Sequence, residues 1–316
     1  MKIAMIGTGY VGLVSGICFS DFGHSVICVD KDPQKIDLLN SGKVPIYEPG
    51  LDALMAKNVA AGRLSFSQDL QAAIDGADAA FIAVGTPTRR GDGHADLQYV
   101  MAAAEEIAQA ASDYLVVVTK STVPVGTNRQ VKQLIRKTAP ALEFDVASNP
   151  EFLREGAAIE DFMKPDRVMI GVQSDRAAEV MAEIYRPLYL RDFPIITTDL
   201  ESAEMTKYAA NAFLATKISF INEISALCEK VGADVKQVAK GMGMDNRIGS
   251  KFLHAGPGYG GSCFPKDTKA LARIGQENAV AMQITETVIK VNDEIKRRMI
   301  EKLLELCDGS FNDKTI

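Results

Sequence analysis

A glycine-rich segment that ends in a cysteine holds the most reactive group of this chain. It reads Gly-Pro-Gly-Tyr-Gly-Gly-Ser-Cys-Phe-Pro-Lys-Asp over residues 256–267. Its glycines give a backbone loop that can press against a ligand before a helix begins. A thiol at the start of that helix, close to Lys266, ionises readily, and the thiolate is the nucleophilic form of cysteine. Asp267 follows Cys263 by about one helical turn and can share its helix face. We predict that Cys263 is a nucleophile rather than a structural cysteine, and that the cysteines inside apolar patterns are buried: Cys18, Cys28, Cys228 and Cys307.

A second pair of polar residues, Lys207 and Asn211, lies in a stretch that predicts one long helix. Residues 199–231 contain neither glycine nor proline, and Thr198 with Glu201 predicts a capping box at the start. The spacing of Lys207 and Asn211 places an ammonium group and an amide on one helix face. Together these groups could hold a sugar oxygen and stabilise an oxyanion. The alternative is a solvated helix face with no chemical role.

The start of the chain carries a dinucleotide-binding motif. A strand pattern over residues 3–6 runs into Gly7-Thr-Gly9-Tyr-Val-Gly12 and then into an apolar helix. In this motif the first glycine permits a tight turn, the second lets the backbone approach a pyrophosphate, and the third lets helix and strand pack closely. The helix N-terminus then faces the phosphates with its positive end. Asp30 ends the next strand, where its carboxylate can accept from both ribose hydroxyls. The pattern predicts NAD rather than NADP, because a carboxylate would repel a 2′-phosphate.

The elements that must position these residues fall into two groups. Up to about residue 196, short apolar runs alternate with helical patterns, which indicates βαβ units; the runs cover residues 3–6, 26–29, 79–84, 115–118, 144–147, 168–172 and 194–196. Beyond them lie two long helical patterns, over residues 199–231 and 279–307. We predict an α/β fold, with a Rossmann-type doubly wound, mostly parallel sheet followed by an all-helical domain with a long central helix. The predicted domains are 1–198 for NAD binding and 199–310 for a helical central and dimerisation domain.

The composition limits the class of protein. At 316 residues the chain exceeds what one ordinary core supports, so about two domains are expected. A net charge of −6 gives no basic field for nucleic acid. No apolar run approaches the ~18 residues that cross a bilayer, so no membrane segment is expected. Five scattered cysteines and three histidines favour a reducing, cytoplasmic location and predict neither a disulfide framework nor a metal site.

Several segments together carry a resemblance to a known family. In chain order and nearly end to end, the sequence resembles the UDP-glucose/GDP-mannose dehydrogenases at Gly7 to Gly12, Val84-Gly-Thr-Pro, Lys120-Ser-Thr-Val-Pro, Asn149-Pro-Glu-Phe-Leu-Arg-Glu-Gly, Lys207 to Asn211, Arg247-Ile-Gly and Gly260-Gly-Ser-Cys-Phe-Pro-Lys-Asp. The match covers essentially all of this chain and the first two of the family's three domains. Residues 311–316 are expected to begin the third, a C-terminal UDP-binding domain.

The resemblance implies an NAD-dependent, four-electron oxidation of UDP-glucose to UDP-glucuronate. Cys263 would attack the aldehyde that the first hydride transfer forms, giving a thiohemiacetal that a second NAD oxidises to a thioester. Lys207 and Asn211 would hold the reacting oxygen. Asp267 would position a water molecule or act as a base with Lys207.

Further site residues follow from the same resemblance. Thr122 would order water near the nicotinamide, and Glu151 would assist thioester hydrolysis. Arg247 would reach the substrate site of a neighbouring subunit. The other implied substrate contacts are Glu151, Phe152, Leu153, Lys207, Asn211, Phe252, Leu253, Tyr259 and Gly260. The implied cofactor contacts are Gly7, Gly9, Tyr10, Val11, Gly12, Asp30, Lys35, Thr86, Thr122, Glu155 and Lys266.

Three alternatives stay open on the sequence alone. A GDP-mannose 6-dehydrogenase would share the cysteine and the Lys–Asn pair, although Arg247-Ile-Gly and residues 252–256 favour UDP-glucose. A two-electron β-hydroxyacid dehydrogenase would use Lys207 and Asn211 without a thiol. A non-catalytic NAD-binding protein is the third. We also expect a homodimer through the long helix, and neither nucleic-acid nor membrane partners.

Overall fold

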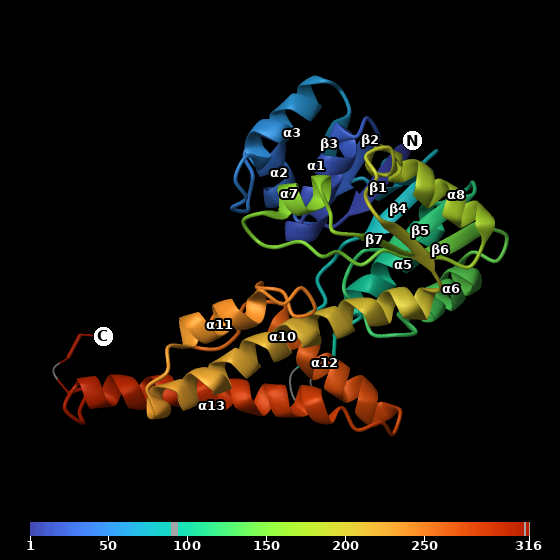
Figure 1. Ribbon diagram of the computed structural model, residues 1–316. Helices are drawn as coiled ribbons and strands as arrows, with labels where there is room; N and C mark the ends of the chain where they lie inside the picture. Colours follow the sequence, from blue (N-terminus) through green and yellow to red (C-terminus); the bar gives the residue numbers. More distant parts are fainter. Residues whose placement is uncertain (90–93, 313, 316) are drawn as a thin grey trace. The chain divides into compact units, whose positions relative to one another are not determined.

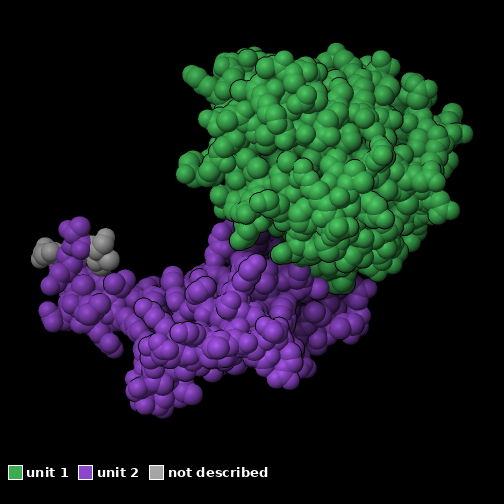
Figure 2. All heavy atoms as spheres, turned by 45° about the horizontal axis from the view of Figure 1, so that its top comes forward, with its two compact units in different colours: residues 1–87, 95–207 green, residues 88–94, 208–316 purple. Residues whose placement is uncertain are grey.

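The computed structural model describes residues 1–89, 94–312 and 314–315 (Figure 1). It divides into two compact units (Figure 2). The sheet unit consists of residues 1–87 and 95–207, and the helical unit consists of residues 88–94 and 208–316. Asp313 and Ile316, which belong to the stretch predicted to begin a third domain, lie outside the described residues.

Strands and helices alternate along the sheet unit. Its strands are β1 (Lys2–Ile6), β2 (Ser25–Val29), β3 (Leu64–Ser67), β4 (Ala79–Ile82), β5 (Leu115–Thr119), β6 (Phe144–Ser148), β7 (Val168–Gly171) and β8 (Ile195–Thr198). Its helices are α1 (Tyr10–Asp21), α2 (Pro33–Asn40), α3 (Leu51–Ala60), α4 (Leu70–Ile74), α5 (Gln98–Ala110), α6 (Thr127–Thr138), α7 (Ala158–Met163), α8 (Asp175–Ile184) and α9 (Arg186–Tyr189).

Within the described ranges, these strands form one sheet in the order β3-β2-β1-β4-β5-β6-β7-β8. Neighbouring strands pair in parallel, as Ile3 does with Val26 of β2 and with Ala79 of β4, except that β6 and β7 are antiparallel. The predicted Rossmann-type, doubly wound and mostly parallel sheet is confirmed. The prediction missed β3, because Leu64 and Phe66 alternate with serines there and no continuous apolar run marks the strand.

Alternate residues along the strands belong to two hydrophobic cores, one on each face of the sheet. Ile3 and Met5 of β1 join a cluster with α1, α3 and α7, whereas Ala4 and Ile6 join a cluster with α4, α5 and α6. Each central strand is therefore buried on both faces, as a parallel sheet covered by helices requires. The carboxyl ends of the parallel strands β1, β4, β5 and β6 meet at one edge, which is where ligands bind in such sheets.

The chain passes from the sheet unit into the helical unit along α10 (Leu200–Val231). The predicted long helix is confirmed, but its predicted cap is wrong. Asp199, not Thr198, accepts a hydrogen bond from the Ser202 N–H at 2.7 Å, and Glu201 instead pairs with Arg129. The carboxylate of Asp199 occupies the capping role because it is one residue closer to the first turn.

The other helices of the helical unit are α11 (Val235–Gly243), α12 (Phe264–Glu277) and α13 (Gln283–Leu306). The last begins later than the predicted start at residue 279. Ala279 adopts a φ of +56°, a left-handed conformation that a helix cannot continue through, so a turn separates α12 from α13. Tyr208 of α10 packs with Leu271 of α12 in the core of this unit.

The described part of the chain has no membrane-spanning helix and no metal-binding cluster. None of its helices combines the length and the apolar character needed to cross a bilayer. In the same ranges, no three His, Cys, Asp or Glu side chains gather where they could hold a metal ion.

Candidate active site

The loop after β1 has the shape of a pyrophosphate cradle. Gly7 has a φ of +100°, and a Cβ there would lie 2.7 Å from the Ala83 carbonyl oxygen. A Cβ at Gly12 would lie 2.0 Å from the Gly7 carbonyl oxygen, so helix and strand pack too closely for a side chain. A Cβ at Gly9, in contrast, would meet no atom within 4 Å. Gly9 is the N-cap of α1, which has no side-chain cap and no acidic residue in its first turn, so its N-terminal amides suit an anionic group.

Asp30 follows β2 and presents an ionised carboxylate near this loop. It accepts hydrogen bonds from the Thr8 N–H at 2.8 Å and the Thr8 hydroxyl at 2.7 Å. Burial alone would raise the pKa of Asp30, but the bonds from Thr8 and the charge of Lys35 outweigh it and lower that pKa. Lys35 lies 3.5 Å from the carboxylate, whereas Lys31 pairs with Glu106. Together with the glycine cradle, this carboxylate fits NAD: the loop would hold the pyrophosphate and Asp30 the ribose.

Tyr10 links the cradle to a loop that follows β6. Its hydroxyl is hydrogen-bonded to the Glu48 carboxylate, and both groups accept from the Gly156 N–H, at 2.8 Å and 2.9 Å. Burial, together with the Glu48 carboxylate, raises the pKa of Tyr10, so the hydroxyl keeps its proton for this bond. The link fixes the segment that carries Glu155, which is exposed. Sequence reasoning missed Glu48, which lay in a Pro- and Gly-containing turn without a recognisable motif.

The loops after β4 and β5 are joined at the same edge of the sheet. The Thr86 hydroxyl donates to the Thr122 carbonyl oxygen at 3.0 Å. The Ser121 hydroxyl donates to the Val84 carbonyl oxygen at 2.7 Å. These bonds hold the two threonines predicted to contact the nicotinamide half of the cofactor next to each other.

Glu151 and Lys207 form a buried ion pair in the sheet unit. The Lys207 Nζ lies 3.0 Å from Glu151 Oε1, and the two side chains are only 5% and 7% exposed. The other carboxylate oxygen accepts from the Leu153 N–H at 2.6 Å. The ring of Phe152 lies under two cations, with Lys207 Nζ 5.2 Å and the Arg167 guanidinium 3.5 Å from its centroid. Cations from other parts of the chain thus hold the loop that is predicted to contact substrate, and Arg167 among them had no signal in the sequence.

Cys263 is the N-cap of α12 and is exposed. Its carbonyl oxygen accepts from the Asp267 N–H at 2.8 Å, which closes the first turn of the helix, and its sulfur lies 3.5 Å from the Ser262 hydroxyl. An exposed thiol at a helix N-terminus is available to a ligand. Of the other cysteines, Cys18, Cys28 and Cys228 are buried as predicted, and burial raises the pKa of Cys28 to about 12. The prediction was wrong for Cys307, which is half-buried because it lies beyond the end of α13.

A polar cluster lies behind the thiol in the helical unit. Asp267 is 1% exposed and accepts from the Asn211 amide at 2.6 Å. Its other oxygen lies 2.9 Å from Lys266 Nζ. The charge of Lys266 is therefore paired with that of Asp267.

Two asparagines shape the glycine loop before Cys263. The Asn292 side chain of α13 accepts from the Tyr259 N–H at 2.7 Å and donates to the Tyr259 carbonyl oxygen at 3.1 Å. Asn222 of α10 accepts from the Gly256 N–H at 2.7 Å. Gly258 has a φ of +96°, and a Cβ there would lie 2.5 Å from Asn292 Oδ1. Sequence reasoning missed both asparagines, because each is remote from the loop along the chain.

Two of the remaining predicted substrate residues, Phe252 and Tyr259, lie beside Phe264, the first residue of α12. Phe252, with a φ of +66°, and the buried Tyr259 both place their rings 6.1 Å from that of Phe264. Leu253 is buried, and Gly260 is exposed with open space at its Cβ position. Arg247 is 88% exposed and pairs with Asp245 of the same chain at 2.7 Å.

Four of the predicted catalytic residues thus form two contacts, each between a carboxylate and a nitrogen-bearing side chain. Lys207 pairs with Glu151 in the sheet unit, and Asn211 pairs with Asp267 in the helical unit. The sequence predicts that Lys207 and Asn211 share one face of a helix. Both lie on α10 at that spacing, and each also contacts a carboxylate.

Comparison with known proteins gives the family. Residues 1–189 match the NAD binding domain of the UDP-glucose/GDP-mannose dehydrogenase family, and residues 201–294 match its central domain. The chain is 61% identical over 318 residues to the UDP-glucose 6-dehydrogenase of Rhizobium meliloti, with all of this chain and 73% of that protein covered. It is 52% identical over 316 residues to the UDP-glucose 6-dehydrogenase TuaD of Bacillus subtilis, with all of this chain and 68% of that protein covered.

A solved structure agrees with this assignment. The UDP-glucose dehydrogenase of the archaeon Pyrobaculum islandicum matches with a TM-score of 0.93 at 42% identity, over 97% of this chain and 71% of that one. The dinucleotide cradle, the buried Lys–Glu pair and the exposed thiol thus occur in a chain that belongs to the UDP-glucose/GDP-mannose dehydrogenase family.

Proposed function

We propose that this NAD-dependent oxidoreductase converts UDP-glucose to UDP-glucuronate in two successive oxidations at one carbon. The observation that carries the proposal is the exposed thiol of Cys263 at the start of α12, in a chain whose sheet unit has an NAD cradle. The names of the relatives at 61% and 52% identity support UDP-glucose as the substrate. NAD, when bound, would supply the acceptor for the hydride in both oxidations.

The first oxidation removes a hydride from the sugar C6 carbon and a proton from its hydroxyl. Lys207 and Asn211 would hold the reacting oxygen by donating hydrogen bonds to it, and negative charge on that oxygen would be stabilised by the Lys207 ammonium group. Asp267 would accept the proton directly or through a positioned water, because it is a buried carboxylate bonded to Asn211. Thr122 would order water beside the reaction.

The second oxidation needs the cysteine. The Cys263 thiolate adds to the aldehyde carbon, and the resulting thiohemiacetal is again an alcohol that can lose a hydride and a proton. The thioester that forms is then attacked by water, which releases the carboxylate product and restores the thiolate. Glu151, held by Lys207 and by the Leu153 N–H, would take a proton from that water.

Counting NADH per sugar tests this proposal. With UDP-glucose limiting and NAD in excess, two NADH per UDP-glucose are expected from the double oxidation. A count of one would indicate an ordinary alcohol dehydrogenase, and no NADH would leave an NAD-binding protein.

The variant Cys263→Ala tests the role of the thiol and should abolish formation of UDP-glucuronate. An unchanged rate of NADH formation in that variant would instead favour a two-electron dehydrogenase that uses Lys207 and Asn211.

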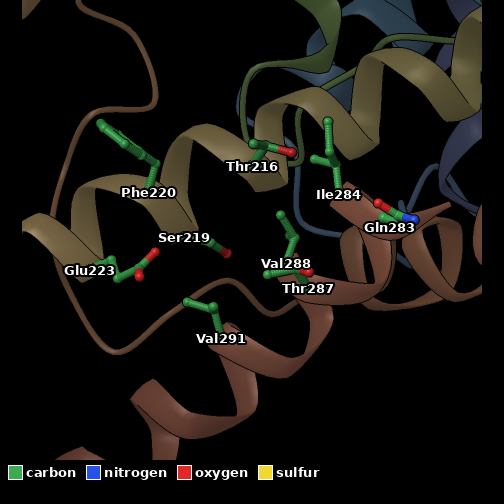
Figure 3. A pocket seen from close by; sticks show the side chains of 9 residues that line it. All are labelled: Thr216, Ser219, Phe220, Glu223, Gln283, Ile284, Thr287, Val288 and Val291. Carbon is green, nitrogen blue, oxygen red and sulfur yellow. The ribbon is translucent and has the colours of Figure 1, made fainter.

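We also propose that two copies of the chain associate through α10. Phe213, Phe220 and Leu227 recur at heptad spacing on this helix and are 66%, 47% and 59% exposed. Phe220 also lines a groove of about 360 Å³ between α10 and α13, together with Ile284 (Figure 3). An apolar stripe of this kind, exposed beside a groove, suits a matching helix of a second copy. A monomer in sedimentation at micromolar concentration would contradict the proposal.

We infer that residues 1–198 form the NAD-binding domain and residues 199–310 the helical central and dimerisation domain. Arg247 would reach the substrate site of the second copy, in keeping with its exposure. The free thiols of all five cysteines support a reducing, cytoplasmic location.

A further inference from the structure

Lys120 is a buried cation beside the proposed active site that none of the steps above uses. It directly follows β5 and is 3% exposed. Its Nζ donates to Asn149 Oδ1 at 3.1 Å and to the Tyr185 hydroxyl at 3.4 Å, and lies 5.7 Å from the Phe162 ring centroid. All three partners are uncharged. Because burying an ammonium group without a directly bonded carboxylate costs several kcal/mol, the position calls for an explanation.

The residues that contact Lys120 hold the chain segment that follows β6 in place. Tyr185 donates to Asn149 Oδ1 at 2.6 Å, and the Asn149 amide donates to the Met169 carbonyl oxygen of β7 at 2.8 Å. Pairing between the antiparallel strands β6 and β7 is short, with Ser148 opposite Gly171. The Asn149 side chain therefore supplies a connection that the strands themselves provide weakly. Glu151 follows two residues later, so this network sets its position.

The charges around Lys120 connect it to the Lys207–Glu151 pair. The pKa of Lys120 is lowered to about 8, mainly by burial and also by the charge of Lys207. Glu151, after β6, and Cys18 of α1 act in the opposite direction. Glu151 already pairs with Lys207 at 3.0 Å. Two buried ammonium groups thus feel the charge of one carboxylate, but only Lys207 pairs with it directly. This leaves net positive charge in this part of the sheet unit.

We propose that Lys120 is a positioning residue for the oxidation proposed above, on which this inference rests: its ammonium group fixes the turn that carries Glu151 and adds a second positive charge beside the Lys207–Glu151 pair. That charge attracts the Glu151 carboxylate and favours the negative charge that develops on an oxygen held by Lys207. It is present below about pH 8 and lost above it. Activity should therefore decline as the pH rises through this range.

Two substitutions of Lys120 separate its charge from its shape. Lys120→Met removes the charge at similar length, and we expect kcat to fall at least about tenfold while KM for UDP-glucose changes less than about twofold. Lys120→Arg keeps a positive charge at every working pH, so it should recover part of kcat and move the basic limb of the pH profile above that of the unsubstituted chain. The matched control is Lys137→Met, an exposed lysine in the last turn of α6, which should behave like the unsubstituted chain. Wild-type kcat and pH profile in Lys120→Met would overturn the proposal.

A measurement without turnover tests the same coupling. Lysine side chains labelled with ¹³C can be titrated by NMR in the whole chain, with the Lys120 signal identified by its loss in Lys120→Arg. We expect a midpoint near pH 8 that rises in Lys207→Met and falls in Glu151→Gln. A midpoint that neither variant moves would overturn the proposal even if the Lys120 variants fold poorly. If the unsubstituted chain forms no NADH from UDP-glucose, the proposed function fails, and these midpoints still decide whether Lys120 is coupled to the pair.

Discussion

The Cys263 thiol and the Asp267 carboxylate lie in the first turn of one helix but in opposite surroundings. The thiol is exposed, whereas the carboxylate is 1% exposed and bonded to Asn211 and Lys266. A nucleophile must be reached by a large substrate, and a proton acceptor works best where water is excluded. The two exposures suit the separate roles proposed for these residues.

Cys263→Ser should stall the reaction before product release. Serine keeps a nucleophilic oxygen at the same helix start, but the alkoxide of an ester leaves less readily than the thiolate of a thioester. We expect a burst of about two NADH per chain, steady turnover lowered at least about 100-fold, and a covalent sugar adduct in the mass spectrum. Cys307→Ser, at a half-buried cysteine after α13, is the control. A steady rate without an adduct would contradict the cysteine mechanism.

Lys120→Met should stabilise the fold at neutral pH. The pKa of Lys120 is about 8 in the folded chain against an ordinary 10.5, so the buried charge costs stability below pH 8. Between pH 8 and 10.5 the folded state loses this proton while the unfolded state keeps it, and the unfolding free energy of the unsubstituted chain rises by up to about 3 kcal/mol from this group. The advantage of Lys120→Met in chemical denaturation should thus shrink between pH 7 and pH 10. A constant difference would argue against a buried charge.

Local sequence patterns single out the candidate site residues but not the residues that they contact. Cys263, and Lys207 with Asn211, stand in short local patterns that can be recognised along the chain. The partner of Lys207 is Glu151, and that of Asn211 is Asp267, and both contacts join distant parts of the sequence. Local spacing carries no information about such contacts, which depend on how strands and helices pack.

At the scale of elements, the glycine loop before α12 is shaped by helices that flank it. Asn292 of α13 bonds both the N–H and the carbonyl group of Tyr259, and Asn222 of α10 bonds the Gly256 N–H.

Continuous apolar runs and helical spacing predicted most strands and the long helix, because those signals are local. They missed β3 and the cap of α10, where Asp199 competes with Thr198 for the same role.

Gly258→Ala should loosen this loop and slow the reaction. Alanine tolerates the φ of +96° poorly, and its Cβ would lie 2.5 Å from Asn292 Oδ1. We expect the unfolding free energy to fall by about 1–3 kcal/mol and kcat to fall with it, since Cys263 lies a few residues further on. Gly256→Ala is the matched control, because a Cβ there meets nothing within 4 Å. Equal stability and turnover for both variants would show that Asn292 does not set the loop.

At the scale of the whole molecule, the chain combines a unit with a cofactor cradle and a unit with a nucleophile. The compact units divide between Lys207 and Tyr208, inside α10, whereas the change of sequence pattern precedes that helix. A continuous helix contains no glycine, proline or linker to mark such a division, so the sequence has no signal there. The same helix carries Lys207 in one unit and Asn211 in the other, which makes its integrity a requirement of the proposed chemistry.

Phe220→Glu should convert the proposed dimer into monomers. Phe220 is 47% exposed on α10 and lines the groove against α13, so a carboxylate there would be buried without a partner when two copies associate (Figure 3). Sedimentation at micromolar concentration should show the unsubstituted chain as a dimer and the variant as a monomer. Tyr99→Glu, at a 51% exposed aromatic residue on α5 of the sheet unit, should stay dimeric. If Arg247 serves the second copy's substrate, Phe220→Glu should also raise KM for UDP-glucose while NAD binding is kept, because the cradle needs only its own chain.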